Sequence, residues 1–405
     1  MGTIGPIWSY NRGRGALQKM RSIFFVIAII VLLPGSNYSG AFVPVPVLAP
    51  PWREAAPGYQ YSFPRDHGAH SDYRVEWWYY TGNLESKNGR RFGYQLTFFR
   101  VGVTRGPANA SKWALRDLYM THFAVSDIER QSFKSFERIN RAGIGWAGAD
   151  TIEYKPDLET NSPAPSIRVW NEDWVAQIDQ TNHTIRASEE SYSIDLKLAP
   201  AKPEVIHGEN GISQRGPSPS NASHYFSVSR AVSSGQIRVG DETFDVSGLS
   251  WVDHEFGTSF LDEQQTGWDW FSIQLEDGRD LMLFQIRRRD GSIDPRSSGT
   301  LIDSRGKPTH LSYSDFSLVP SNFWRSPKSG ATYPVTWKID LFSQGLRLNV
   351  AAAFSDQELT ENDSTGITYW EGSIAAEDIE DRKIRGRGYL EMTGYAGPSM
   401  GSLVQ

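Results

Sequence analysis

One strand–turn–strand pattern occurs twice in this 405-residue chain, once in each half. Trp77 in the first copy aligns with Trp268 in the second, and Tyr79 aligns with Trp270. The two copies are EWWYYTGNLESKNGRRFGYQLTFFR (76–100) and GWDWFSIQLEDGRDLMLFQIRR (267–288). A supersecondary unit that recurs with the spacing of two half-chains indicates duplication of a larger fold. We therefore expect two similar units, at residues 58–235 and 236–405.

The local patterns predict an all-β fold. Asn88-Gly89 and Asp277-Gly278 each lie between runs of alternating apolar and polar residues, which is the strongest short-range signal of a β-hairpin. No stretch shows a long helical periodicity. Each half is long enough for an eight-stranded antiparallel β-barrel, so two tandem barrels are the predicted architecture.

Aromatic residues are abundant, with 14 Trp, 17 Tyr and 20 Phe. Such side chains could line an apolar cavity for a hydrophobic small molecule, because small barrels can enclose one ligand. They could equally fill two solid barrel cores and leave no room for a guest. The sequence leaves both alternatives open.

The first 41 residues have the pattern of a secretory signal peptide. Residues 23–33, IFFVIAIIVLL, form an apolar run that follows basic residues, and Ser39 and Ala41 give a small-x-small cleavage site. An uncleaved membrane anchor is the alternative, although the run is short for a bilayer span. We expect export to the periplasm or the medium after cleavage near Ala41, with Met20 as an alternative start to Met1.

Composition narrows the classes of partner. Removing residues 1–41 removes four of the 41 basic residues and none of the 47 acidic ones, so the mature chain has a net charge of about −10. A nucleic-acid partner is therefore not expected. The chain has no cysteine, which excludes disulfides and thiolate chemistry. Residues 42–57 are proline-rich and predict an extended leader.

Four ordered motifs resemble one protein family. They are HSDYRVEWWYYTGNL (70–84), GLSWVDHEFGTS (248–259), GWDWFSIQLEDGRDLMLF (267–284) and YWEGSI with GRGYLEMTGY (369–395). They are similar to the AttH-like, carotenoid-hydratase-related family of secreted proteins. The resemblance covers the chain from about residue 58 to its C-terminus.

The resemblance implies two tandem lipocalin-like barrels that handle hydrophobic, lipid-like or polyene-like small molecules. Family members include a hydratase of carotenoid double bonds, relatives that catalyse cyclisations, and exported proteins encoded near exporter genes. Components of a membrane transporter are thus implied as candidate partners. The hydratase pattern also implies an acidic residue on the strand after the second hairpin, but LMLFQIRR has no acid before Asp290.

The DHEFG motif, residues 253–257, allows two interpretations. An apolar, strand-like stretch precedes it, so we expect it where a strand ends. The resemblance implies a place at the start of the second barrel. As a structural element, Asp253 would bond to turn amides and His254 would span the two barrels. As a functional element, His254 or a neighbouring acid would donate a proton to a ligand. Family members often have Trp at the position of Phe256.

Cofactor-free addition of water to an alkene requires a desolvated acid, and aromatic faces that stabilise the carbocation. The candidates for this acid by location are Asp253, Glu255, Asp269 and Glu371. The candidate catalytic residues are Asp253, His254, Glu255 and Glu371. The candidate ligand-binding residues are Trp77, Trp78, Trp251, Phe256, Trp268, Trp270, Tyr369 and Trp370.

Other active-site classes find no support in the sequence. There is no G-x-S-x-G elbow, phosphate-binding glycine loop or H-E-x-x-H helix. The spacing of His122, His224 and His254 matches no metal motif, so we expect neither a metal nor a cofactor. The leading hypothesis is an exported protein that binds or carries a hydrophobic small molecule. The alternatives are a cofactor-independent hydro-lyase or isomerase, and a purely structural protein with filled barrels.

Overall fold

The structure is a computed structural model that describes residues 51–105, 111, 114–143, 145–152, 166–259, 261–360 and 367–397. The predicted signal peptide and the first part of the predicted leader lie outside the described residues. Within those residues, no helix combines the length and apolar character needed to cross a membrane. The described helices are three short 3-10 turns, η1 (Arg65–His67), η2 (Tyr313–Asp315) and η3 (Phe342–Gln344).

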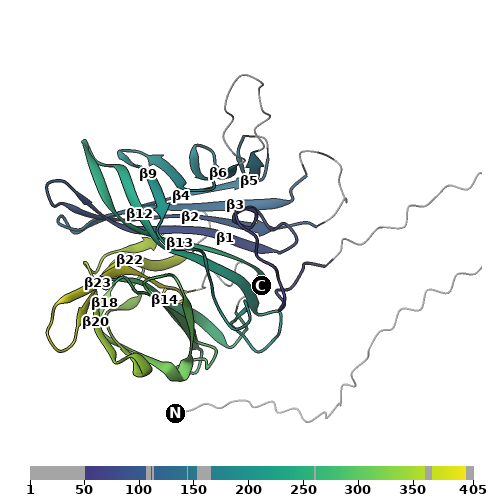
Figure 1. Cartoon of the computed structure of the whole chain (residues 1–405). Coiled ribbons are helices and arrows are strands. Elements are labelled where there is room, and N and C mark those ends of the chain that lie inside the picture. Colours follow the sequence, from purple (N-terminus) through teal and green to yellow (C-terminus); the bar gives the residue numbers. More distant parts are fainter. Residues whose placement is uncertain are drawn as a thin grey trace, which may run out of the picture. The chain divides into compact units, whose positions relative to one another are not determined.

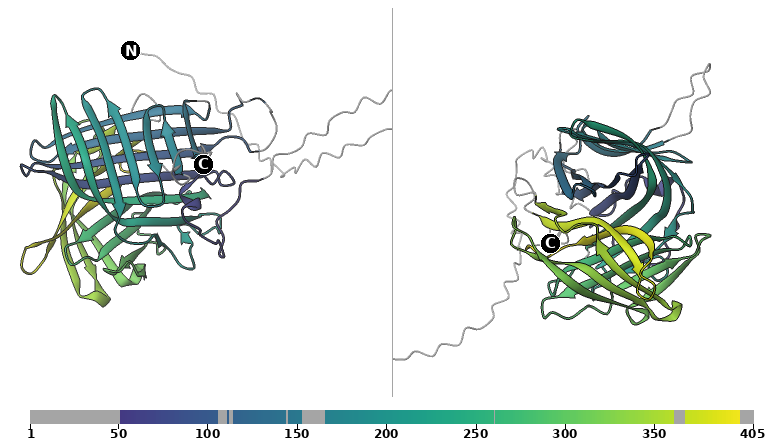
Figure 2. Two further views of the ribbon diagram at one scale, coloured as in Figure 1. Left: turned by 45° about the horizontal axis from the view of Figure 1, so that its top comes forward. Right: turned by 90° about the vertical axis from the view of Figure 1, so that its left-hand side faces the viewer.

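The chain forms two antiparallel sheets, which confirms the all-β prediction. Each sheet curves into a barrel-like shape, and the two lie side by side in both views (Figures 1 and 2). The first sheet has 13 strands, with β4-β3-β2-β1-β13-β12-β9-β8-β7-β6-β5 as its main path. The second has 10 strands, with β17-β16-β15-β14-β23-β22-β20-β19-β18 as its main path.

The strands of the first sheet are β1 (Val75–Ser86), β2 (Arg91–Gly102), β3 (Asp117–Asp127), β4 (Ser132–Arg141), β5 (Ala147–Ile152), β6 (Ser166–Asn171), β7 (Trp174–Ile178), β8 (His183–Glu189), β9 (Tyr192–Pro200), β10 (Val205–Ile206), β11 (Ser213–Gln214), β12 (Ala222–Val239) and β13 (Glu242–Ser259). Those of the second are β14 (Gln265–Leu275), β15 (Asp280–Arg288), β16 (Ser298–Ile302), β17 (Pro308–Ser312), β18 (Phe316–Arg325), β19 (Thr332–Leu341), β20 (Leu346–Ala352), β21 (Glu358–Thr360), β22 (Thr368–Asp378) and β23 (Ile384–Met392).

Both copies of the repeat form the predicted hairpins. The first copy is the hairpin β1–β2 and the second is β14–β15. Gly89 and Gly278 occupy their turns with φ of 83° and 87°, in the left-handed region that glycine adopts without steric cost. The repeat therefore marks the same element in each sheet.

The boundary between the two sheets lies later in the sequence than the predicted boundary at residues 235 and 236. Residue 235 lies in the middle of β12, and β12 and β13 form a long hairpin that belongs to the first sheet. The second sheet begins at Gln265. Because β13 pairs with β1 along its length, the DHEFG motif lies inside the last strand of the first sheet, not at a strand end or in the second barrel.

Apolar side chains fill the interior of each sheet. The first core includes Trp78, Tyr80 and Trp174, and the second includes Phe271 and Trp337. A third apolar cluster, rich in aromatic residues, contains side chains of both sheets. Packing of large aromatic groups thus explains much of the aromatic content without a ligand inside either barrel.

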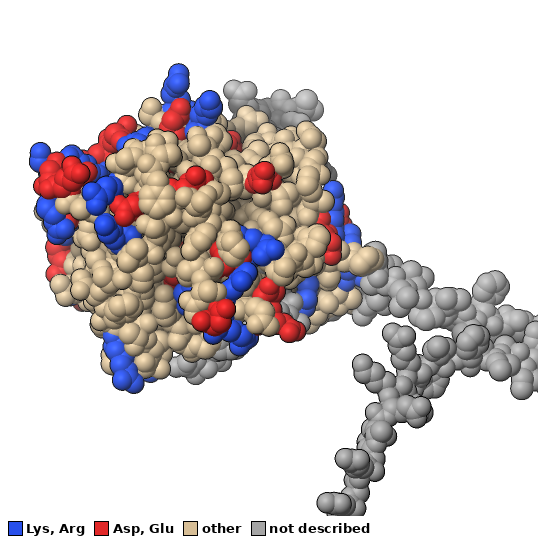
Figure 3. Space-filling view, turned by 90° about the horizontal axis from the view of Figure 1, so that it is seen from below, with Lys and Arg blue, Asp and Glu red and all other residues tan. Residues whose placement is uncertain are grey.

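Polar bonds also join the two sheets. Asp280, on β15, is fully buried and accepts bonds from Lys202 Nζ at 2.6 Å and from Arg230 Nη2 at 2.7 Å. Gln95 on β2 donates to the hydroxyl of Tyr369 on β22 at 3.0 Å. On the face of the molecule in Figure 3, groups of both charge signs lie interspersed among uncharged residues.

Candidate functional site

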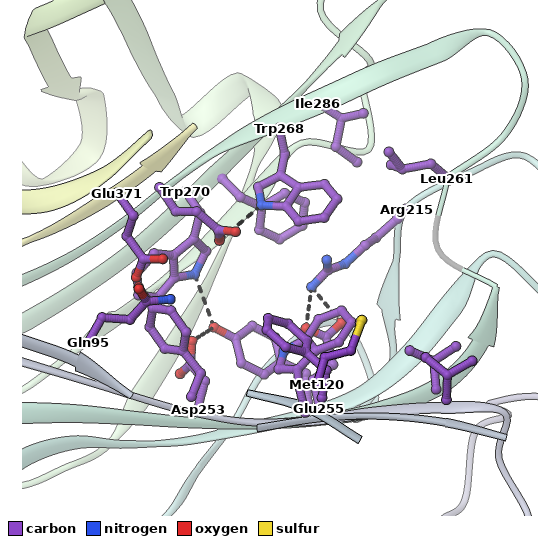
Figure 4. A pocket seen from close by; sticks show the side chains of 18 residues that line it. Gln95, Met120, Arg215, Asp253, Glu255, Leu261, Trp268, Trp270, Ile286 and Glu371 are labelled. Atoms are coloured by element: carbon purple, nitrogen blue, oxygen red, sulfur yellow. Dashed lines mark hydrogen bonds and ion pairs between the residues drawn. The ribbon is translucent and has the colours of Figure 1, made fainter. Parts of the chain in front are cut away.

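A cavity of about 60 Å³ lies between the two sheets, outside both barrel interiors. Its wall comes from β1, β2, β3, β12 and β13 of the first sheet, and from β14, β15, β22 and β23 of the second. Figure 4 shows the side chains that converge on it, among them Trp268, Trp270, Asp253 and Glu371. The wall is mostly apolar, so buried carboxyl groups stand out in it.

Strand alternation explains which residues reach this cavity. Successive side chains of a strand point to opposite faces, so Trp77 and Tyr79 line the cavity while Trp78 packs in the first core. Trp268 and Trp270, their counterparts in the repeat, line the cavity from the second sheet. The Tyr79 and Trp270 rings meet edge to face with centroids 5.2 Å apart. The duplicated hairpins thus face each other across the site.

Asp253 is a buried carboxyl group on the cavity wall. Its oxygens accept bonds from the Tyr225 hydroxyl at 2.7 Å, from Trp251 Nε1 at 2.6 Å, and from the Ser227 hydroxyl. Burial raises the pKa of Asp253 to about 7, although these three donors oppose the rise. Asp253 can therefore exchange a proton near neutral pH.

Glu255 forms an ion pair with Arg215 on the same wall. Arg215 Nη2 lies 2.6 Å from one carboxylate oxygen of Glu255 and 2.8 Å from the other. Burial raises the pKa of Glu255, while Arg215 lowers it. The Arg215 guanidinium lies over the ring of Phe284, 5.1 Å from its centroid. The opposite charges of this ion pair compensate each other, so it makes the cavity wall polar and adds little net charge.

Glu371 is the least compensated acid of the site. Its carboxyl group is buried, and neither oxygen has a hydrogen-bond partner among the described residues. Burial, reinforced by Glu391, raises the pKa of Glu371 well above its ordinary value. The Tyr79 hydroxyl is near enough to oppose this rise, but it does not meet hydrogen-bond geometry. Burial therefore favours the protonated form of Glu371.

Glu391 lies directly opposite Glu371 on the neighbouring strand β23. Burial raises the pKa of Glu391 to about 7, although Trp268 Nε1 donates to its carboxylate at 3.2 Å. The cavity thus holds three carboxyl groups whose pKa values burial raises, Asp253, Glu371 and Glu391, next to aromatic rings. Such a site can protonate an apolar unsaturated molecule and stabilise the positive charge that results.

His254 points away from the cavity, into a polar cluster of the first sheet. Its Nε2 lies 2.8 Å from Glu76 Oε1, which His70 Nδ1 approaches to 2.7 Å. Arg100 Nε donates to the other oxygen of Glu76 at 3.0 Å. His254 therefore does not span the two barrels, and Asp253 bonds to side chains and not to turn amides. The contacts of His254 with Glu76 lie within the first sheet, so its structural role is to stabilise that sheet.

His70, Glu76 and His254 bring three potential metal-ligand atoms within 4.8 Å of one another. Their nitrogen–oxygen separations are those of hydrogen bonds. Two ligands on one zinc ion lie farther apart, because each bond to zinc is about 2.0–2.1 Å long. Arg100 already neutralises Glu76, and burial lowers the pKa of His254 to about 4 despite Glu76. The arrangement is a hydrogen-bonded charge network.

The structure brings together only part of the predicted site. Asp253, Glu255 and Glu371 line the cavity, as do Trp77, Trp268 and Trp270. The other predicted residues do not line it. They are Trp78 and Trp370 in the two cores, Phe256 in a cluster with Tyr73, Trp251 behind Asp253, Tyr369 bonded to His122, His254 in the polar cluster, and Asp269 bonded to Gln285.

Several residues of the cavity were not predicted from the sequence. They are Tyr79, Gln95, Arg215, Tyr225, Phe284 and Glu391. Glu391 had a readable signal, since YWE and YLE each place a glutamate two residues after a tyrosine in neighbouring motifs. Arg215 and Tyr225 had none, because Arg215 reaches the site from the segment after β11 and Tyr225 from the long strand β12, and no local pattern predicts either position.

The strand on which the resemblance implied an acid is β15, the second strand of the hairpin β14–β15. Its one acid, Asp280, lies at its start and bonds to Lys202 and Arg230, whereas Phe284 and Ile286 face the cavity. Acids reach the same cavity from β22 and β23 instead, as Glu371 and Glu391. The lack of a cavity-facing acid on β15 therefore does not remove acid chemistry from the site.

Comparison with known proteins places the chain in a family. A profile of the AttH-like family matches residues 54–395. The crystal structure of a protein assigned as an AttH from Nitrosomonas europaea has a TM-score of 0.73 and 34% identity, covering 85% of this chain and 99% of that one. Kievitone hydratase from Nectria haematococca has a TM-score of 0.61 and 14% identity, covering 84% and 94%.

The hydratase shares the fold at low identity. No curated protein sequence matches the chain. The match to the family profile spans both sheets, and the similarity to the Nitrosomonas structure spans nearly all of that protein. This chain belongs to the AttH-like family.

Proposed function

We propose that the protein is a cofactor-independent hydro-lyase or isomerase that acts on the double bond of an apolar small molecule. The observation that carries this proposal is Glu371, a buried carboxyl group with no hydrogen-bond partner among the described residues, on an aromatic cavity wall. Kievitone hydratase, which shares the fold, is named for the hydration of an organic molecule.

A binding or carrier function explains less of the cavity. A carrier of an apolar molecule needs an apolar wall, which Trp268, Trp270 and Phe284 already provide. Burying a polar group without a partner costs about 1–3 kcal/mol, and Glu371 adds nothing to apolar contact. Residues that lower stability in this way are characteristic of catalytic sites. The enzyme hypothesis therefore moves ahead of the carrier hypothesis.

In the proposed hydration, the Glu371 carboxyl transfers its proton to one alkene carbon, and the π electrons form the new C–H bond. The other carbon becomes a cation, which faces the rings of Trp270 and Tyr79. A water oxygen forms the C–O bond, and the ionised form of Asp253 accepts the proton that water loses. Exchange with solvent then returns a proton to Glu371 and removes one from Asp253. In an isomerisation, Asp253 would instead remove a proton from a neighbouring carbon.

The size of the cavity limits the substrate. A space of about 60 Å³ accommodates a small molecule, or the end of a longer one, but not an entire carotenoid. We therefore propose a compact unsaturated compound, or the terminal double bond of a longer chain, as the group that enters.

The test is incubation of the purified protein with small terpenoid alkenes in water enriched in oxygen-18. Mass spectrometry should show products that have gained one labelled water, or isomers of unchanged mass. Glu371→Gln keeps the shape of the side chain and lacks the acidic proton, so it should lose turnover and still bind the alkenes. Equal turnover in the wild type and Glu371→Gln would refute the assignment. Binding of the alkenes without any conversion would favour the carrier hypothesis.

We also propose export of the protein and cooperation with components of a membrane transporter. The N-terminal apolar run with its small-x-small site supports export. An association with exporters rests on the resemblance to the family. Co-purification from detergent-solubilised membranes of the native host would test the partnership, with the Glu371→Gln protein as a control that retains its outer surface.

A further inference from the structure

A chain of hydrogen-bonding side chains leads from Asp253 away from the cavity. Ser227 on β12 lies opposite Asp253 and bonds to its Oδ1. His207 Nε2 lies 2.6 Å from Ser227 Oγ, and His207 Nδ1 lies 2.8 Å from Thr300 Oγ1. All four side chains are buried. The path therefore crosses from the first sheet to β16 of the second without a break.

The far end of the path lies next to the molecular surface. Thr300 on β16 pairs with His310 on β17, which is exposed. His310 is near enough to His207 to lower the pKa of that imidazole, which burial alone already lowers. The path thus joins a buried carboxyl group to a region that solvent reaches.

The donors along the path have one consistent direction when Asp253 is ionised. A carboxylate can only accept, so the Ser227 hydroxyl donates to Asp253. Ser227 Oγ then accepts from His207 Nε2–H, and the unprotonated Nδ1 accepts from the Thr300 hydroxyl. Burial lowers the pKa of His207 to about 3, which agrees with a neutral ring. Every donor points toward Asp253.

We propose that Thr300, His207 and Ser227 form a proton relay between solvent near His310 and the cavity carboxyl of Asp253. The Thr300 proton moves to Nδ1, the Nε2 proton moves to Ser227, and the Ser227 proton moves to Asp253. Thr300 regains a proton from water or from His310. One proton enters and one reaches Asp253, so the relay residues keep their charge. The reverse sequence releases a proton.

The relay depends on the proposed function in one respect only, namely that the transferred proton takes part in catalysis in the cavity. An acid–base site enclosed between two sheets must exchange protons with solvent after each turnover. Tyr225 and Trp251 also donate to Asp253, but they are not part of the path. Among the described residues, the only other bond of the Tyr225 hydroxyl comes from the indole of Trp270, and an indole N–H is a donor only. Glu255, on the same strand, raises the pKa of Asp253. Arg215, like His310, lowers the pKa of His207.

A photochemical pH jump tests the relay without a substrate. Trp251 Nε1 donates to Asp253, so tryptophan fluorescence should report the protonation of Asp253. The relaxation phase that is absent in the Asp253→Asn protein is the one that belongs to this protonation. His207→Gln keeps a donor and an acceptor but has an amide, which does not pass protons readily. We expect its fluorescence titration to keep the wild-type midpoint while the relaxation slows about tenfold or more, which corresponds to about 1.4 kcal/mol on the barrier.

Two further variants complete the test. Thr300→Val removes the entry hydroxyl and should slow the relaxation in the same way, which provides a second reading should His207→Gln fold poorly. Tyr225→Phe removes a donor to Asp253 that lies off the path, so it should shift the midpoint and keep the fast relaxation. Wild-type relaxation in both path variants, or no phase that depends on Asp253, would overturn the relay. A relay that passes this test in a protein without alkene turnover would refute the proposed function alone.

Discussion

Replacing His254 with alanine tests whether the DHEFG motif serves stability or the cavity. His254 is buried, bonds to Glu76 at 2.8 Å, and lies against the ring of Trp78 at a centroid distance of 4.8 Å. It does not line the cavity. We therefore expect His254→Ala to destabilise the fold and to leave ligand binding by the folded protein intact.

The structure sets the magnitude of the loss. A buried hydrogen bond to a charged group contributes about 1.5–3 kcal/mol. Removing the imidazole from its contacts with Trp78 and Phe226 leaves a cavity that costs about 2 kcal/mol more. The sum is about 4 kcal/mol. With an unfolding entropy of about 2.1 cal/mol/K per residue over the two sheets, this corresponds to a fall in Tm of about 6 °C.

The loss should also depend on pH. Burial lowers the native pKa of His254 to about 4, from its ordinary value of 6.5. The unfolded chain therefore binds a proton that the native protein does not, and native stability from this group falls as pH decreases from 6.5 to 4. Asp253 and Glu391, whose pKa values are raised to about 7, act in the opposite direction, because they favour the native state at lower pH. Both the wild type and His254→Ala contain these acids, so their contributions cancel in the difference between the two free energies of unfolding. That difference should be largest above pH 6.5 and become smaller toward pH 4.

The assay is thermal unfolding followed by circular dichroism at several pH values, together with quenching of tryptophan fluorescence by β-ionone at 25 °C. Trp268→Ala is the matched control, because this tryptophan lines the cavity and its loss should weaken β-ionone binding. A His254→Ala protein that melts like the wild type and no longer binds β-ionone would refute the reasoning. That result would assign His254 to the ligand site.

Three other results follow from the structure. Asp280→Ala leaves two cations at the junction of the sheets without their buried carboxylate and should cost about 3–5 kcal/mol by thermal unfolding, whereas Glu263→Ala, at an exposed site, should be neutral. Glu371→Leu should abolish turnover and raise stability by about 1–2 kcal/mol, because it removes an unpartnered buried polar group; a lower Tm would contradict this. N-terminal sequencing of exported protein should begin near Phe42, and an intact apolar segment in membranes would instead support an anchor.

The sequence alone determined the class of fold and the main elements of the site. Strand alternation and the Asn88-Gly89 and Asp277-Gly278 turns are local properties, and both hairpins form where they predict. The duplicated hairpin predicted two units, and its two copies lie in different sheets. Trp77 and Trp268, which the repeat aligned, both reach the cavity.

Tertiary structure decided where the site lies and which acids belong to it. Alternation tells that His254 and Asp253 point to opposite faces, but it does not tell which face is a core and which meets the second sheet. That choice depends on the packing of the second sheet against one face of the first, which leaves His254 on the other face and places Asp253 and Glu371 on the wall of one cavity. Arg215 and Glu391 are far apart in sequence, and only the packing of the two sheets brings them to one wall. The same packing removes water from the carboxyl groups, and this desolvation, which no local pattern encodes, raises their pKa values.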